Sequence, residues 1–476
     1  MTNKSLKWTA ALLALGLGAA GAVQAAEQPT QQELLQQLNE LKAKVAAMEQ
    51  TQANQAQAQA KYDSRDVDAT VAAVLKDAGT HSLLVDGGGL VGGWDRTRMG
   101  FFLGSEDGSS YFHPGIIWQF REVTSYREKA KNGGSDTQSG FENTRIKPLI
   151  DGTLFSKDFS YKFMLDFDRN TGTPVVQDAY AAYVFAHHSI LDGDLAVKFG
   201  QFKPQTFREE FMGDNFQLAA ERSLANFLIG GTPIGPRVQG VSLLLTGPTS
   251  PLHGEVLVHD GDRSQNTDFR DQQPATGTPP VLPAAVNWGA AARVEYKLFG
   301  NWADQADFTS HTAKSDFLVI GAGLDMSQQD NSNTYRYTVD AQYKMMQRLS
   351  AFAGFYGTHF DFRNVAPGGN DSRDDMGGMA QVGFELSRQW ELFGRYSLVH
   401  FDKDFLAAGV NKQVHELTAG VNFYTGPDGS YGHHAKITVD VTYLPNGAPA
   451  FTQGGILNSV NKRDEIVLRG QFQLWI

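Results

Sequence analysis

The sequence contains no cysteine and, after residue 20, no apolar run long enough for a membrane-spanning helix. The missing cysteine excludes disulfides, thiolate nucleophiles and cysteine metal sites. Basic residues are the minority, since 41 Lys and Arg stand against 52 Asp and Glu, giving a net charge of -11. Nucleic-acid binding needs a basic face, so we expect no nucleic-acid partner. The mean hydropathy of -0.33 suits a transmembrane barrel, in which half of each strand faces water.

The first 25 residues have the pattern of a secretory signal peptide. Lys4 and Lys7 precede the apolar segment 8–20, and Val23 and Ala25 are small residues at the -3 and -1 positions. We expect cleavage after Ala25 or one residue later. The mature chain is then expected outside the cytoplasm.

Residues 26–60 predict a periplasmic coiled-coil helix followed by a linker. The apolar positions step by four, three, four and three: Leu34, Leu38, Leu41, Val45 and Met48. This is a heptad a/d spacing. A single amphipathic helix is the alternative, because the pattern extends over few heptads.

Residues 61–110 are expected to be a connecting segment. Gly87, Gly89 and Gly92 have the spacing G-x-G-x-x-G. A dinucleotide site also needs a strand before this motif and a helix after it. Residues 94–98 do not resemble the start of a helix, so we expect no nucleotide cofactor.

Residues 111–476 predict an all-β fold, a transmembrane antiparallel β-barrel of about sixteen strands. In residues 160–168, Phe163 and Leu165 lie on one face of a strand, and Lys162 and Asp166 lie on the other. Short turns alternate with long polar loops, as in bacterial barrels. The predicted strands are roughly 112–123, 141–155, 158–168, 176–185, 193–202, 237–246, 252–259, 288–298, 317–327, 333–344, 349–360, 376–387, 389–400, 414–424, 434–443 and 464–476.

A soluble β-sandwich would also show alternation, but its apolar faces would meet each other. Aromatic residues near strand ends, such as Tyr161, Tyr343, Trp390 and Tyr443, favour the membrane because they suit interfacial girdles. The chain ends with an aromatic residue in the penultimate position, Trp475. The strand pattern predicts that its side chain faces inward.

Several motifs resemble the phosphate-selective porin O and P family. They are Asp151-Gly152-Thr153-Leu154-Phe155, Leu165-Asp166-Phe167-Asp168, Gln177-Asp178-Ala179-Tyr180, Val197-Lys198-Phe199-Gly200-Gln201-Phe202-Lys203-Pro204 and Ala220-Glu221-Arg222-Ser223-Leu224. The resemblance implies a sixteen-stranded outer-membrane porin, usually a homotrimer with anion-preferring pores. It also implies that residues of about 204–236 form a loop that folds inward and narrows the pore. An exposed outer loop is the alternative.

The alternation predicts charged side chains on the inner face. The predicted basic pore-lining residues are Arg145, Lys147, Lys162, Lys198, Arg293, Arg336, Arg395, Lys436 and Arg469. The predicted acidic ones are Asp166, Asp168, Asp340 and Glu385. The predicted constriction residues are Arg208, Glu209, Glu210, Asp214, Glu221 and Arg222. Rings of cations favour anions, whereas a wall with balanced charges selects little.

The sequence departs from the family pattern where Thr144 stands beside Arg145 in place of an arginine pair. The predicted constriction also contains carboxylates, which would weaken phosphate binding by repulsion. We therefore expect a water-filled channel for passive diffusion of small hydrophilic solutes, with at most a modest preference for anions such as phosphate. A cation-preferring or non-selective porin is the alternative.

An enzyme or an adhesin built on a barrel is a further alternative. The adjacent pairs His187-His188 and His433-His434 would each supply one metal ligand at most, because neighbours in a strand point to opposite faces. No Gly-x-Ser-x-Gly motif occurs. We expect no enzymatic activity, metal or cofactor, and the expected partners are outer-membrane lipid, two further copies of the chain and small solutes.

Overall fold

The computed structural model describes residues 39, 42–51, 89–127, 137–230, 236–261, 264–266, 286–329, 332–363, 365, 369–405, 411–448, 454–457 and 464–476. The chain divides into two units, Met1–Gly87 and Gly88–Ile476. In the first unit, residue 39 and residues 42–51 are helical and exposed. The predicted signal peptide and the remainder of the predicted coiled coil lie outside the described residues. In the part of the chain that is described, no helix combines the length and apolarity needed to cross a membrane.

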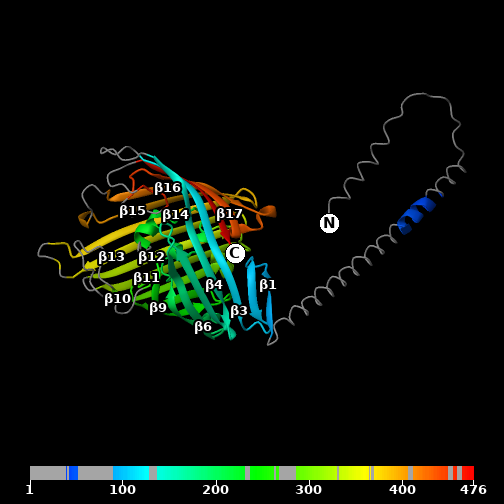
Figure 1. Ribbon diagram of the computed structural model, residues 1–476, viewed down its shortest axis with the longest axis horizontal. Coiled ribbons are helices and arrows are strands. Elements are labelled where there is room, and N and C mark those ends of the chain that lie inside the picture. The colour runs from blue at the N-terminus through cyan, green and yellow to red at the C-terminus, as the bar shows by residue number, and fades with distance from the viewer. Residues whose placement is uncertain are drawn as a thin grey trace, which may run out of the picture. The chain divides into compact units, whose positions relative to one another are not determined.

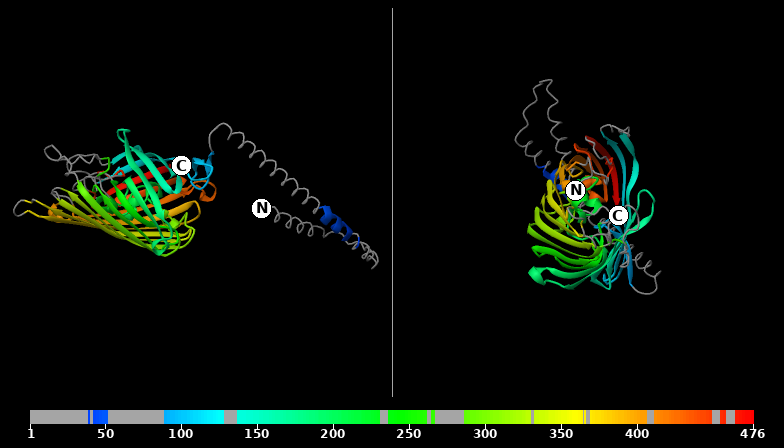
Figure 2. Two further views of the ribbon diagram at one scale, coloured as in Figure 1. Left: turned by 90° about the horizontal axis from the view of Figure 1, so that it is seen from below. Right: turned by 90° about the vertical axis from the view of Figure 1, so that its left-hand side faces the viewer.

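Strands β3 to β18 of the second unit form an antiparallel barrel of sixteen strands (Figures 1 and 2). The barrel closes where β18 pairs with β3, from Ile466 opposite Tyr126 to Trp475 opposite Ile117. The strands are β3 (Tyr111–Tyr126), β4 (Thr137–Leu154), β5 (Ser156–Phe167), β6 (Pro174–Ala186), β7 (Asp194–Phe202), β8 (Val238–Thr246), β9 (Leu252–His259), β10 (Val286–Phe299), β11 (Phe317–Gln329), β12 (Ser332–Met345), β13 (Leu349–Phe362), β14 (Ser372–Glu385), β15 (Trp390–His400), β16 (Gln413–Tyr424), β17 (Ala435–Leu444) and β18 (Glu465–Trp475). Each predicted strand has its counterpart, so the predicted barrel is confirmed.

A hairpin of β1 (Leu90–Asp95) and β2 (Gly100–Ser105) precedes the barrel. It lies in the segment that we predicted to be only a connection. β2 joins β3 at Leu103 and Phe112, on the same edge that β18 occupies further along β3. Gly92 lies inside β1, so the glycine-rich stretch enters a strand there.

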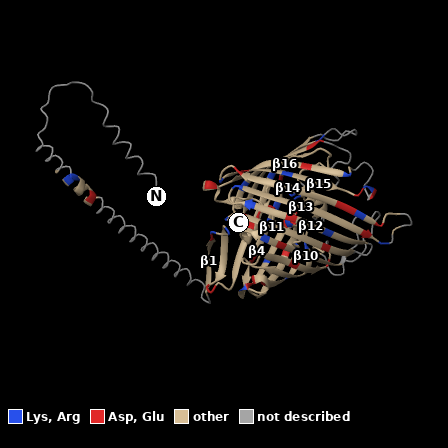
Figure 3. Cartoon of the chain, turned by 180° about the vertical axis from the view of Figure 1, so that it is seen from behind, with Lys and Arg blue, Asp and Glu red and all other residues tan. Residues whose placement is uncertain are grey.

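The strand faces follow the predicted alternation. In β17, Lys436 and Asp440 are buried inside the barrel, whereas Ile437 and Val441 are exposed on the outside. Charged residues recur along neighbouring strands (Figure 3). Many of them are buried, because their side chains point to the inner face of the wall. Trp475 also faces inward as predicted, with its ring 5.0 Å from that of Phe216.

The described residues between β7 and β8, 203–230 and 236–237, fold into the barrel and are called the constriction loop below. It contains α2 (Arg208–Phe211), η2 (Asp214–Phe216) and η3 (Asn226–Gly230). One side of the loop packs on strands β13 to β16, where it forms the largest apolar cluster. That cluster includes Phe207, Met212, Leu218, Leu224 and Ile229 of the loop and Phe352, Tyr356, Met379, Phe393, Val399 and Val414 of the strands.

A second inward segment, residues 300–316, joins β10 to β11 and is called the supporting loop below. It comes from the end of the barrel that carries the short turns, and it contains η4 (Trp302–Ala306). Phe308 donates its backbone N–H to the carbonyl of Phe216, and Arg208 donates to the carbonyl of Gln305. The supporting loop therefore holds the constriction loop from the short-turn side. No pattern in residues 300–316 predicts this arrangement.

The remaining helical turns are short and lie between strands. They are η1 (Ile190–Asp192), η5 (Lys403–Phe405), η6 (Pro427–Gly429) and η7 (Gly432–His434).

Candidate functional site

Two cavities lie inside the barrel between the constriction loop and the wall formed mainly by β3 to β7. The loop-side cavity includes Arg169 and Gln177, which lie near the end of the barrel with the long loops. The turn-side cavity includes Arg98 and Ser160, near the end with the short turns. Four described residues line both cavities: Lys147, Lys203, Asp214 and Arg237. These four define the level at which the cavities meet, and they are called the junction residues below.

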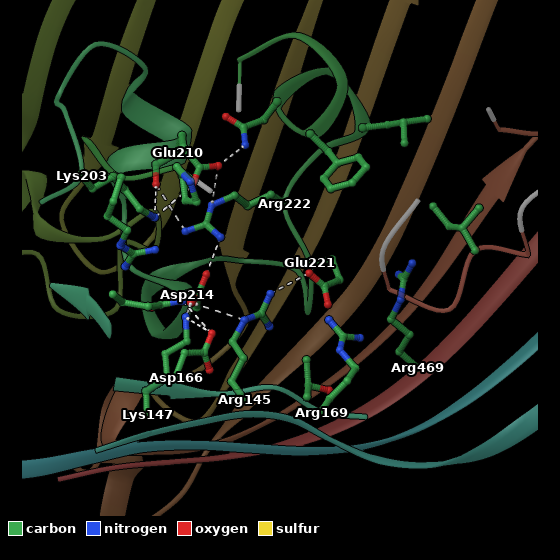
Figure 4. Close-up of a pocket in the computed structure, with 18 of the residues that line it drawn as sticks. Arg145, Lys147, Asp166, Arg169, Lys203, Glu210, Asp214, Glu221, Arg222 and Arg469 are labelled. Atoms are coloured by element: carbon green, nitrogen blue, oxygen red, sulfur yellow. Dashed lines mark hydrogen bonds and ion pairs between the residues drawn. The ribbon is translucent and has the colours of Figure 1, made fainter. Parts of the chain in front are cut away.

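The junction residues come from different parts of the fold. Lys147 extends from β4, Asp214 lies in the constriction loop, and Lys203 and Arg237 stand at the two ends of that loop. Lys147 contacts the Asp214 carboxylate, and Arg222 contacts the other oxygen of the same group. Figure 4 shows these side chains converging on Asp214 from the wall and from the loop.

A second ion-pair network lies beside the junction, in the loop-side cavity. Glu221 accepts from Arg145 at 2.8 Å and from Arg121 on β3. Arg145 also lies 3.3 Å from Asp214 through its Nε atom (Figure 4). Arginine suits such shared positions because its planar guanidinium can donate to two carboxylates at once.

Ionisation at the constriction loop depends on these neighbours. Burial opposes ionisation of Glu210, but the charges of Arg222 and Lys203 outweigh it and hold the Glu210 pKa at about 2. Burial lowers the pKa of Lys203 to about 7, and Arg222 and Arg237 add to this effect, although Glu210 at 3.0 Å opposes it. Lys203 therefore changes charge near neutral pH, whereas Glu210 stays ionised.

The lining charges are unequal in both cavities. Among the described residues, eight cations and five carboxylates line the loop-side cavity. Six cations and three carboxylates line the turn-side cavity. The chain as a whole is acidic, with a net charge of -11. Positive charge is therefore concentrated along this passage.

The structure places the residues predicted to line the pore in two groups. The first group lines one or both cavities: Arg145, Lys147, Lys162, Lys198, Asp166, Arg395 and Arg469, together with Glu210, Asp214, Glu221 and Arg222 of the constriction loop. The second group faces the barrel interior but lines neither cavity: Arg293, Arg336, Lys436, Asp340, Glu385, Arg208 and Glu209.

The second group requires a correction, because several of its members hold the inward segments in place. Arg293 forms a two-pronged pair with Asp340, at 2.9 and 2.8 Å, and donates to the carbonyl of Thr206 at 3.1 Å. Lys436 donates to the carbonyl of Gln217 at 2.8 Å, and Glu385 accepts from Ser310 of the supporting loop. These inner-face charges pair with loop atoms, so they line neither cavity.

The prediction for Asp168 is also corrected. Asp168 lies just beyond β5 and is exposed. Its carboxylate accepts from the backbone N–H groups of Asn170 and Thr171 at 3.0 and 2.8 Å. Such bonds stabilise a turn. Asp168 therefore shapes the β5–β6 connection and does not belong to either cavity.

The predictions missed Lys203, Arg237, Arg169 and Arg121. Lys203 and Arg237 flank the constriction loop, so their position at the loop ends was a usable signal. Alternation does not reach these two residues, because β7 ends at Phe202 and β8 begins at Val238.

At least one histidine of each pair lies close to an aspartate. His187 lies within hydrogen-bond distance of Asp158 and Asp194, and His433 lies 3.4 Å from Asp307. Within the described ranges, no group of three His, Asp or Glu side chains is placed to hold a metal ion.

A closed barrel with a narrowed, charged passage defines a channel protein of the outer-membrane type. Residues 123–429 match the family model described as phosphate-selective porin O and P. The match covers more than half of the chain, so the chain belongs to this family and is an outer-membrane porin of bacteria. Members of this family and fold are channel proteins. No curated protein matches the sequence.

Solved structures with a similar fold include an anion-selective porin from Comamonas acidovorans, with 12% identity, a TM-score of 0.49 and coverage of 77% of this chain and 100% of that chain. The outer-membrane channel DcaP of Acinetobacter baumannii has 15% identity and a TM-score of 0.47, covering 78% and 99%. OprB of Pseudomonas putida has 12% identity and a TM-score of 0.49, covering 78% and 95%. The assignment to a family rests on the family model.

The anchoring of the constriction loop can be tested at Glu209, which is fully buried. Its carboxylate accepts from Ser223 N–H and Oγ, both at 2.7 Å, and from Tyr356 at 3.0 Å. Glu209→Ala leaves these donors unpaired, at a cost of about 1–3 kcal/mol for each buried group. Because the constriction loop is then held less firmly, we expect the open-channel current of this variant in planar bilayers to fluctuate more than that of the unaltered protein.

The control is Glu209→Gln, which keeps an acceptor oxygen and should restore part of the quiet current. Equal noise in Glu209→Ala and the unaltered protein would contradict the anchoring role.

Proposed function

We propose that the protein is a diffusion channel for small hydrophilic solutes with a modest preference for anions such as phosphate. The observation that carries this proposal is the composition of the junction, where three cations and one carboxylate line both cavities. Charge at the level where the two cavities meet has a strong effect on selectivity, because it acts at short range and away from bulk water.

The preference is expected to be modest because the junction cations already have partners. Lys147 pairs with Asp214, Lys203 with Glu210, and Arg237 lies 3.0 Å from Asp178. A passing anion must compete with these carboxylates for the same donors. Such competition lowers affinity and allows rapid release, which suits passive diffusion.

We further propose that the pore-lining set consists of the residues that line the two cavities, and that residues of about 204–236 act as its constriction. Residues 1–25 serve as a cleaved signal peptide, and residues 26–60 form a periplasmic coiled coil and linker. The helical residues 42–51 support a helix in this region, and exposed Val45 and Met48 leave an apolar face for further chains. A homotrimer would bring three such helices together.

Selectivity can be tested by removing one lysine at a time. Lys203→Met removes a cation from the junction, so the reversal potential in a KCl gradient should shift toward lower anion preference, by roughly twofold in the permeability ratio. Lys157→Met removes the same charge from an exposed position at the start of β5 that lines neither cavity, and it should leave the ratio unchanged. Clear cation selectivity of the unaltered protein would overturn the proposal.

The pKa of Lys203 gives a pH dependence with a definite sign. Since this pKa is lowered to about 7, Lys203 is cationic below pH 7 and largely neutral above it. Anion preference should therefore decrease as the pH is raised from 6 to 8, measured by reversal potentials at constant ionic strength. Lys203→Met should flatten the profile over this range. A profile that rises with pH, or that is unchanged by the substitution, would contradict this assignment.

A further inference from the structure

The inner wall of the turn-side cavity contains an apolar strip where alternation predicts polar residues. Ile117 on β3, Leu149 on β4 and Met164 on β5 all face inward and form one cluster, with Trp475 of β18 packed against it. All four line the turn-side cavity. Water-filled barrels usually carry polar residues on this face. The four residues are called the apolar strip below.

Strand register makes the strip continuous across the wall. Trp475 lies opposite Ile117, and Leu149 lies opposite Met164. The constriction loop extends the strip, because the ring of Phe216 lies 5.0 Å from that of Trp475. An apolar surface therefore extends from β18 to β5 on the turn side of the junction.

Cations border this surface. Lys147 lies opposite Ile117 in the β3–β4 register, and it belongs to the junction. Lys162 on β5 and Lys198 on β7 also line the cavity. Lys162 is 3.1 Å from Asp178, and Lys198 is 2.9 Å from Glu255. The cavity therefore combines an apolar wall with ammonium donors, and its volume of about 630 Å³ accommodates a small organic molecule.

We propose that the turn-side cavity binds small carboxylates that carry an apolar body, such as an aromatic ring, during their passage. The carboxylate meets the junction cations, and the apolar body lies against the apolar strip. This inference rests on the proposed anion preference and specifies its substrate class. An inorganic anion such as phosphate would use the cations and gain nothing from the strip, because apolar contact stabilises only apolar surface.

The test measures block of the chloride current through single channels by benzoate, acetate and inorganic phosphate. Benzoate and acetate carry the same carboxylate, so the difference between them isolates the ring. We expect half-block by benzoate at a concentration about tenfold lower than that for acetate, a ratio that corresponds to about 1.4 kcal/mol. Met164→Gln and Ile117→Thr should each raise the half-blocking concentration of benzoate several-fold and leave that of acetate unchanged.

The control variant is Val467→Thr, which also makes an inward-facing residue polar but lies outside both cavities. This variant should have the same half-blocking concentrations of benzoate and of acetate as the unaltered channel. Equal block by benzoate and acetate in an anion-selective channel would overturn this inference and leave the proposed function standing. Cation selectivity in the KCl gradient would instead overturn the proposed function itself. If a strip variant fails to insert into the membrane, the comparison of benzoate with acetate on the unaltered channel still tests this inference.

Discussion

The structure depends on the ion-paired anchoring of the constriction loop inside the barrel. An inward loop carries buried carboxylates and backbone groups, which are costly unless they are paired. The inner wall supplies the partners: Arg145 and Lys147 bind the loop on one side, and Arg395 donates to the carbonyl of Glu221 at 2.7 Å on another. The same arginines and lysines that hold the loop also give the passage its charge. Anchoring and selectivity are therefore coupled.

The barrel interior is divided by this arrangement. The constriction loop and the supporting loop pack against one part of the wall, with Phe308 and Phe352 4.7 Å apart between their ring centroids. The two cavities occupy the part lined mainly by β3 to β7. Inward-facing charged residues therefore have two different roles. Arg293 and Asp340 join the wall to the loop, whereas Lys162 and Lys198 stand along the passage.

The sequence predicts the wall better than the passage. A period of two decides which face Phe163 or Lys436 occupies, because strand geometry is local. Whether an inward residue meets water or a folded loop depends on contacts between distant segments, as for Lys436 and Gln217. The supporting loop was missed for the same reason, since no local pattern in residues 300–316 shows that they turn inward. Lys203 and Arg237 were missed because alternation ends where the loop begins.

The absence of cysteine allows the divided interior to be tested directly, with single cysteines at two inward positions. Ser160 lines the turn-side cavity, and Thr438 on β17 is buried and lines neither cavity. A charged methanethiosulfonate reagent should modify Ser160→Cys rapidly and change its single-channel conductance, and it should leave Thr438→Cys unmodified. Equal modification of the two cysteines would show that water fills both parts of the interior, and it would contradict the account.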